Sequence, residues 1–334
     1  SEVEMRITRD TLLNQARENA KLLTTKDRSI ICIYVSGSLL REDPFLGGIT
    51  DIDLICVHDR PVKTQREIIR LSPDITLDLA HYDQEEFEPP RKLRTNAWIG
   101  SWLEAVPIVL YDTLRWYDFM RAAATAQIWK AENVAARVRS FLVPARKTWA
   151  DLQEEAIPQG IKRTTAFLGA LADTANAVAC LTGSPVAERR LVYELPSRAE
   201  AAGLPDFTAN FIPLFTSAEF TDENFSAWAD SYHLFFDALK DIPESLAELA
   251  LCRRAYYEKA VRALYPVNPA GALWLLLNTW TRAATVLPKT ELPYKDWQSI
   301  CRQLEVDSKS LTARLDDLDH LLDTVEEVTD RLAS

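Results

Sequence analysis

The stretch Ile31-Cys-Ile-Tyr-Val-Ser-Gly37-Ser38, followed by Thr50-Asp51-Ile52-Asp53-Leu54, decides how this chain is interpreted. Residues 29–35 form an apolar run rich in β-branched side chains, which predicts a buried strand that ends at the turn Ser36-Gly37-Ser38. A glycine in this turn lets a phosphate group approach the backbone closely, and the two serines add hydroxyl donors. The turn therefore predicts half of a phosphate-binding site.

Two aspartates at the start of the next apolar run supply the other half. Side chains alternate between the two faces of a strand, so Asp51 and Asp53 share one face while Ile52 and Leu54 point to the core. Neighbouring ionised carboxylates repel each other, and a cation relieves that repulsion. Their hard oxygen ligands favour Mg²⁺ or Mn²⁺ over zinc.

A third carboxylate is expected from the run Ile75-Thr-Leu-Asp78-Leu-Ala80, in which Asp78 lies on the face opposite to the apolar one. If this strand pairs with the strand of Asp51 and Asp53, three carboxylates converge opposite the Gly37-Ser38 turn. Three aspartates can hold two metal ions about 3.5–4 Å apart, an arrangement that serves phosphoryl-group displacement.

This combination resembles the nucleotidyltransferase superfamily that includes DNA polymerase β, and in particular its aminoglycoside and lincosamide nucleotidyltransferases. The resemblance covers residues 28–82. One departure is the acidic and apolar segment 42–48, where members of the family often carry a shorter segment rich in arginine and glycine. The family implies transfer of a nucleoside monophosphate, with AMP from ATP as the expected donor, to the hydroxyl of a small acceptor, with release of pyrophosphate.

The resemblance also implies a role for each residue of the motif. Asp51, Asp53 and Asp78 are the expected catalytic residues and ligands of two Mg²⁺ or Mn²⁺ ions, with Asp78 helping to deprotonate the acceptor. The expected nucleotide contacts come from the turn, from the cation that follows it and from a lysine of the C-terminal half: Ser36, Gly37, Ser38, Arg41 and Lys295. No residue stands out as a separate general base.

Other kinds of site receive less support. His58 and His81 flank the aspartates in sequence, but each lies an odd number of positions from its nearest aspartate and so points to the opposite face. They are interpreted as structural histidines rather than zinc ligands. The chain has no G-x-S-x-G elbow and no P-loop lysine motif.

Composition limits the partners and the compartment. The net charge of −11 disfavours extended nucleic acid as an acceptor and suits a small or cationic molecule. The five cysteines are odd in number and contain no CxxC pair, which predicts reduced thiols in a cytoplasmic protein. No signal peptide is recognised, and the apolar stretch around residues 270–277 is too short to span a membrane.

The pattern predicts an α+β protein: a nucleotidyltransferase domain with a small mixed sheet over residues 1–112, followed by an all-α helical bundle over residues 113–334. In the first part we expect helices at residues 8–23 and 62–71 and strands near residues 30–36, 51–57, 75–81 and 106–111. In the second part we expect helical segments over residues 120–155, 161–182, 219–240 and 246–264.

The last helix carries a heptad-like apolar stripe from Leu311 to Leu332. Packing on the bundle is the first interpretation, and a dimer seam or an acidic wall for a cationic acceptor is the second, so monomer and homodimer both stay open. An alternative function also stays open: a nucleotide-binding sensor or antitoxin-like protein that acts on a protein partner through its helical domain. The acceptor likewise remains open among aminoglycosides, lincosamides, other hydroxylated metabolites, a protein side chain and a tRNA end.

Overall fold

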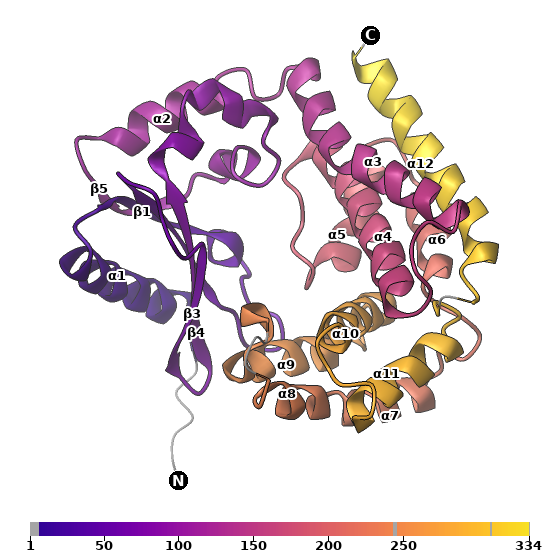
Figure 1. The fold of residues 1–334 in the computed structure, drawn as a ribbon. Helices are drawn as coiled ribbons and strands as arrows, with labels where there is room; N and C mark the ends of the chain where they lie inside the picture. The colour runs from indigo at the N-terminus through magenta and orange to yellow at the C-terminus, as the bar shows by residue number, and fades with distance from the viewer. Residues whose placement is uncertain (1–6, 243–245, 308, 334) are drawn as a thin grey trace. The chain divides into compact units, whose positions relative to one another are not determined.

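The computed structural model describes residues 7–242, 246–307 and 309–333. It is an α+β protein, and its described strands form a five-stranded mixed sheet, which confirms the predicted α+β class and the mixed sheet. The chain forms two compact units, Ser1–Ile128 and Trp129–Ser334. Among the described residues, every β-strand lies in the first unit and the second unit is helical (Figure 1).

The first unit is built on a sheet with strand order β3-β4-β2-β1-β5. Its elements are α1 (Arg9–Lys26), β1 (Ile30–Ser36), η1 (Gly37–Leu40), β2 (Ile52–His58), β3 (Arg66–Ser72), β4 (Ile75–Asp83), η2 (Gln84–Phe87), η3 (Pro90–Thr95), η4 (Ser101–Ala105), β5 (Ile108–Asp112) and α2 (Trp116–Thr125). Strands β2 and β4 run parallel, and the other three pairings are antiparallel.

Each face of the sheet has its own apolar core. On one face, α1 buries Leu12 and Ala16 against Ile33, Ile52 and Leu79. On the other face, α2 packs its buried Tyr117 and Met120 near Cys32 and Tyr34 of β1. Figure 1 shows α1 and α2 on opposite sides of the strands.

The expected helix over residues 62–71 is wrong, because residues 66–72 form strand β3 at the sheet edge. Its side chains are half-buried or exposed, which leaves a weak apolar pattern that also fits one face of a helix. The tight Ser72-Pro73-Asp74 connection to β4 produces an antiparallel hairpin, and the apolar Ile69 and Leu71 pack against the core on the α1 side.

The sequence places the domain boundary near Asp112, whereas the first unit of the structure continues to Ile128. The reason is α2, which contributes buried Tyr117, Met120 and Ala124 to the core beside the sheet. A change from strand-like to helix-like periodicity marks where the last strand ends, and this helix still belongs to the strand-containing unit.

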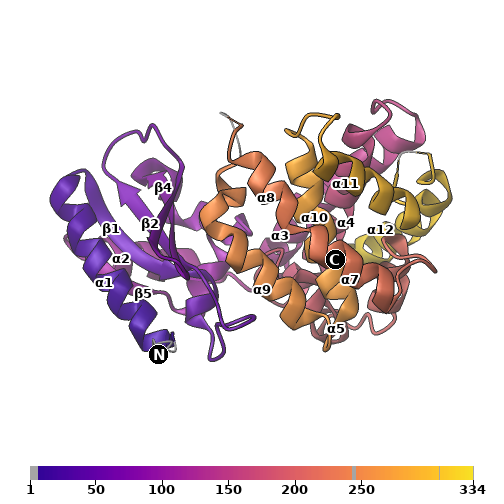
Figure 2. The ribbon, with the colours of Figure 1, turned by 90° about the horizontal axis from the view of Figure 1, so that it is seen from below.

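The second unit packs long helices around buried aromatic side chains. It comprises α3 (Ala131–Gln153), α4 (Ile161–Thr182), α5 (Leu191–Ala201), α6 (Phe207–Phe211), η5 (Ile212–Leu214), α7 (Asp222–Ser231), α8 (His233–Leu239), η6 (Ala247–Leu249), η7 (Leu251–Arg253), α9 (Arg254–Leu264), α10 (Pro269–Ala284), α11 (Leu292–Gln303) and α12 (Thr312–Ala333). Helices α8 to α11 lie close together (Figure 2), and Trp274 and Trp280 of α10 are each 1% exposed.

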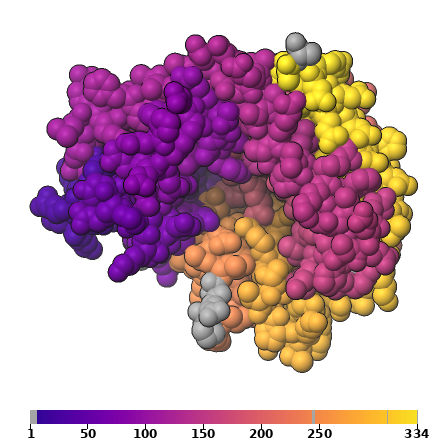
Figure 3. Space-filling model, turned by 45° about the horizontal axis from the view of Figure 1, so that its top comes forward, coloured from indigo at the N-terminus to yellow at the C-terminus, as the bar shows by residue number. Residues whose placement is uncertain are grey.

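Helix α12 lies along α3 and α4 (Figure 3), and its stripe from Leu315 to Thr329 is buried within the unit. Arg146 of α3 bonds to Asp319, Asp323 and Glu326 on the acidic side of α12. The heptad-like stripe thus packs on the bundle, as first interpreted.

In the part of the chain that the structure describes, one helix, α4, is long and apolar enough to cross a membrane by length and composition. About two thirds of its apolar window is buried inside the unit, and the core helix of a globular protein passes the same test.

Replacement of the fully buried Leu79 by alanine tests the core beneath β4. We expect Leu79→Ala to lower the free energy of unfolding by about 2–5 kcal/mol, because a cavity opens between the sheet and α1. The matched control is Leu22→Ala on α1, whose side chain is 58% exposed, with an expected change within about 0.5 kcal/mol. Chemical denaturation followed by circular dichroism measures both values, and equal effects would contradict this packing.

Candidate functional site

The parallel pairing of β2 with β4 places two of the predicted carboxylates side by side. Asp53 is the register partner of Asp78, and the preceding pair, Ile52 and Leu77, is fully buried on the opposite face. Asp51 lies one position before β2 and therefore shares the face of Asp53. The structure thus gathers the three predicted aspartates on one face of the sheet.

Gly37 lies directly against this carboxylate face. Ser36, the last residue of β1, pairs with Asp53, and Gly37 follows with a left-handed φ of +69°. A Cβ atom built on Gly37 would overlap the Asp53 carboxylate and would lie 2.9 Å from its Cγ. Glycine is favoured here for two reasons: it adopts the left-handed backbone angle readily, and it has no Cβ to overlap the carboxylate.

Hydrogen bonds hold the turn in place on both sides. The hydroxyls of Ser38 and Thr50 lie 2.5 Å apart, so the turn is tied to the segment that leads into β2. Arg9 Nε of α1 donates to the Leu39 carbonyl at 2.9 Å, and the Arg41 N–H donates to the Ser38 carbonyl at 3.0 Å. These bonds fix the predicted helical turn as the short 3₁₀ segment η1.

Asp51 and Asp78 contact polar side chains on neighbouring strands. Thr76 Oγ1 donates to Asp51 Oδ1 at 2.5 Å, and the Asp51 side chain is buried. Arg66 of β3 forms a bidentate pair with Asp78, with distances of 2.9 Å from Nε to Oδ1 and 2.6 Å from Nη2 to Oδ2. The Asp78 side chain is 9% exposed and that of Arg66 is 44% exposed, so the guanidinium reaches inward from solvent.

Within residues 7–242, 246–307 and 309–333, no three His, Cys, Asp or Glu side chains are positioned to hold a metal ion directly. Asp78 faces the Arg66 guanidinium and Asp51 accepts from Thr76, so part of the negative charge is already compensated by the protein. Coordination of a cation here requires these side chains to rearrange.

The remaining predicted contacts fall in different places. Ser36, Gly37 and Ser38 lie at the carboxylate face, and the half-buried Arg41 ends the η1 turn. Lys295 is exposed in α11 of the second unit. It is therefore not part of the group of residues that the first unit assembles.

Arg66, which places a cation at the carboxylate face, is not among the residues predicted from the sequence. The residue was hidden by the wrong assignment of residues 62–71 to a helix, which removed it from the sheet. The Ser72-Pro73-Asp74 turn between two apolar runs is the sequence feature that indicates a hairpin. In this hairpin Arg66 pairs with Ala80, on the same face as Asp78 and two positions along β4, so the guanidinium reaches Asp78 diagonally.

His58 and His81 form a separate polar cluster on the other face of the sheet, as the odd spacing predicts. His58 Nε2 and His81 Nδ1 lie 2.9 Å apart, and the Ser29 hydroxyl lies 2.8 Å from His58 Nδ1. Asp27 lies 3.6 Å from His58, and Glu67 lies 3.9 Å from His81. Burial is the largest influence on both imidazoles and lowers the pKa of each from the ordinary 6.5.

Neither the protein-family models nor the curated proteins searched give a match to this chain. The case for a nucleotide site therefore rests on the residues and contacts of the carboxylate face.

Substitution of Gly37 tests the close approach of the turn to Asp53. Gly48 also has a left-handed φ, +74°, but a Cβ there meets no atom within 4 Å. We expect Gly48→Ala to cost about 1–2 kcal/mol for the backbone angle alone. Gly37→Ala should cost about 1–3 kcal/mol more, because either the turn or the carboxylate must move. Chemical denaturation of both variants measures the difference.

A double-mutant cycle separates overlap with the carboxylate from other effects. In an Asp53→Ala background the two nearest atoms, Oδ2 and Cγ, are absent, so the cost of Gly37→Ala should fall toward that of Gly48→Ala. An unchanged cost in that background would argue against the contact.

The histidine pair predicts a pH-dependent stability. Because folding lowers both pKa values, the unfolded chain binds more protons in this range, and stability is lost as pH falls from 6.5 through the folded pKa values. We expect the free energy of unfolding to decrease as the pH falls from about 7.5 to 5. We expect this pH dependence to weaken in the double variant His58→Gln/His81→Gln. His233→Gln, in α8, is the control, and an equal slope in all three proteins would refute this origin.

Proposed function

We propose that the first unit is a Mg²⁺-dependent nucleotidyltransferase site that transfers a nucleoside monophosphate, AMP from ATP, to a hydroxyl of a small molecule. The observation that carries the proposal is the close approach of Gly37 to Asp53, with Asp78 as the next neighbour across β2 and β4. A phosphate group needs a backbone without a side chain, and its metal partners need adjacent carboxylates. Both are found within one small area of the sheet.

The donor set fits a hard divalent cation. Asp51 and Asp53 would hold one Mg²⁺ or Mn²⁺ and Asp78 would reach a second, and such ions supply charge neutralisation for a triphosphate and for the departing pyrophosphate. Arg66 and Thr76 compensate part of the negative charge of Asp78 and Asp51. In the proposed site, bound cations would take over this compensation.

The protein's own groups have distinct tasks in the proposed reaction. The Gly37 backbone and the Ser38 hydroxyl bind the terminal phosphates. Asp78 orients the acceptor hydroxyl and accepts its proton as the oxygen attacks the α-phosphorus and pyrophosphate leaves. For this step the Arg66–Asp78 pair must open, and the partly exposed guanidinium is then available for a phosphate oxygen.

The acceptor we favour is a small hydroxylated cation of the aminoglycoside type. A chain of net charge −11 attracts cations and repels polyanions, so extended nucleic acid is disfavoured. The role of Lys295 as a phosphate contact stays a prediction from the sequence. The cytoplasm, where ATP and Mg²⁺ are plentiful, is the proposed compartment.

Three carboxamide variants test the chemistry: Asp51→Asn, Asp53→Asn and Asp78→Asn. We expect each to reduce pyrophosphate release from ATP and Mg²⁺ with aminoglycoside acceptors by roughly 10³-fold, on the order of 4 kcal/mol of transition-state stabilisation. Mass spectrometry should detect the AMP adduct of the acceptor with the unmodified protein only. Asp59→Asn is the matched control, since Asp59 is an exposed carboxylate beyond the end of β2.

Circular dichroism must first show that each variant is folded. Turnover at the unmodified rate in any of the three would overturn the assignment of that residue. Tight Mg²⁺-dependent ATP binding by calorimetry, without pyrophosphate release for any acceptor, would instead support the nucleotide-binding sensor.

A further inference from the structure

A second binding site is indicated by a pocket of about 610 Å³ within the first unit. It is lined by Phe87, Glu88, Pro89, Pro90, Trp116, Phe119 and Met120. These residues come from the segment that follows β4 and from α2, which begins just after β5. Pockets of this size hold small organic molecules.

The pocket lies away from the proposed catalytic residues. Asp53 and Thr76 lie near the beginnings of β2 and β4, whereas Phe87 and Glu88 follow the far end of β4. Trp116 follows β5, whose last residue, Asp112, pairs near the start of β1. The two sites therefore occupy opposite ends of the strands.

The walls of the pocket are apolar and aromatic and are well supported. Phe87 is fully buried and meets the Trp116 ring edge to face, with ring centroids 5.4 Å apart. Met120 is 2% exposed and closes the inner wall, while Phe119 is 73% exposed at the rim. The indole of Trp116, which lines the pocket, is thereby held in place.

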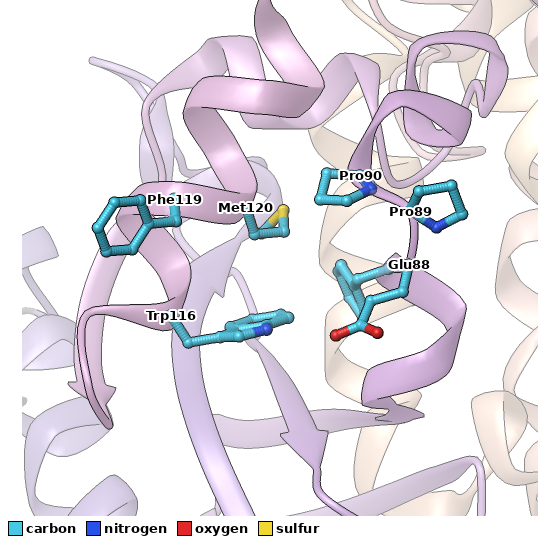
Figure 4. A pocket seen from close by; sticks show the side chains of 7 residues that line it. Glu88, Pro89, Pro90, Trp116, Phe119 and Met120 are labelled. Atoms are coloured by element: carbon cyan, nitrogen blue, oxygen red, sulfur yellow. The ribbon is translucent and has the colours of Figure 1, made fainter.

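One carboxylate supplies the charge of the pocket. Figure 4 shows the Glu88 carboxylate across the opening from the Trp116 indole, with Met120 and Pro90 beside the gap. The Gln84 side-chain amide donates to Glu88 Oε1 at 2.9 Å and so restrains the carboxylate. The residues that line this pocket, all from the described part of the chain, include no lysine or arginine.

We propose that this pocket binds a small organic ammonium ion, with its alkylated nitrogen between the Trp116 ring and the Glu88 carboxylate. Aromatic faces attract cations, and alkylated ammonium groups suit such sites because they lose little hydration when they enter an apolar cavity. The carboxylate adds an attraction that a neutral ligand of the same shape lacks. Recognition thus depends on charge as well as on shape.

Choline and its neutral isostere, in which carbon replaces the quaternary nitrogen, are the probes. In ¹H–¹⁵N spectra of the full chain, the Trp116 indole resonance is identified by its loss in Trp116→Phe. We expect choline to shift this resonance with a millimolar dissociation constant and the isostere to bind about 10-fold more weakly, which corresponds to about 1.4 kcal/mol. Added salt should weaken choline binding and leave the isostere unaffected.

Glu88→Gln tests the carboxylate without removing the apolar walls. It should weaken choline binding about 5-fold and leave binding of the isostere unchanged. Glu85→Gln, an exposed carboxylate outside the pocket lining, should change neither. Equal binding of the two probes, or an unchanged preference in Glu88→Gln, would overturn the assignment to a cation. A Trp116 resonance that responds to neither probe would overturn the site itself.

Discussion

The parallel, in-register pairing of β2 with β4 is the constraint on which the first unit depends. One face of this pair buries Ile52, Leu54, Leu77 and Leu79 beneath α1, and burial of four such side chains is worth several kcal/mol. A shift of one residue would place these side chains in the polar face and the aspartates in the core. The apolar face therefore fixes the register, and the register places Asp53 beside Asp78.

Gathering Asp51, Asp53 and Asp78 on one face has an electrostatic cost that the protein must offset. Arg66 from the edge strand and Thr76 from β4 do so in the described structure, through a bidentate ion pair and a short hydrogen bond. The same face meets Gly37, whose missing side chain leaves room for the Asp53 carboxylate. Binding of metal ions and a triphosphate would replace the contacts of these carboxylates with Arg66 and Thr76 by contacts with the bound cations.

The unit also separates its polar groups by face and by strand end. The histidine pair lies on the opposite face from the aspartates, so its protonation acts on stability rather than on the proposed chemistry. The aromatic pocket of Glu88 and Trp116 lies at the far ends of the strands. Alternation along a strand and the two ends of a sheet thus separate the aspartates, the histidine pair and the aromatic pocket within about 130 residues.

The sequence by itself determined the α+β class, the strands that carry Asp53 and Asp78, the Gly37 turn and the face of each histidine. These features are local, since alternation and turn chemistry appear within a few residues. The tertiary structure decided what depends on non-local pairing: the edge strand β3, the approach of Arg66 to Asp78, the inclusion of α2 in the first unit and the pocket between Glu88 and Trp116. A half-exposed strand leaves only a weak pattern that also fits a helix, and a pocket built from separate segments leaves none, because the partners that define them lie elsewhere in the chain.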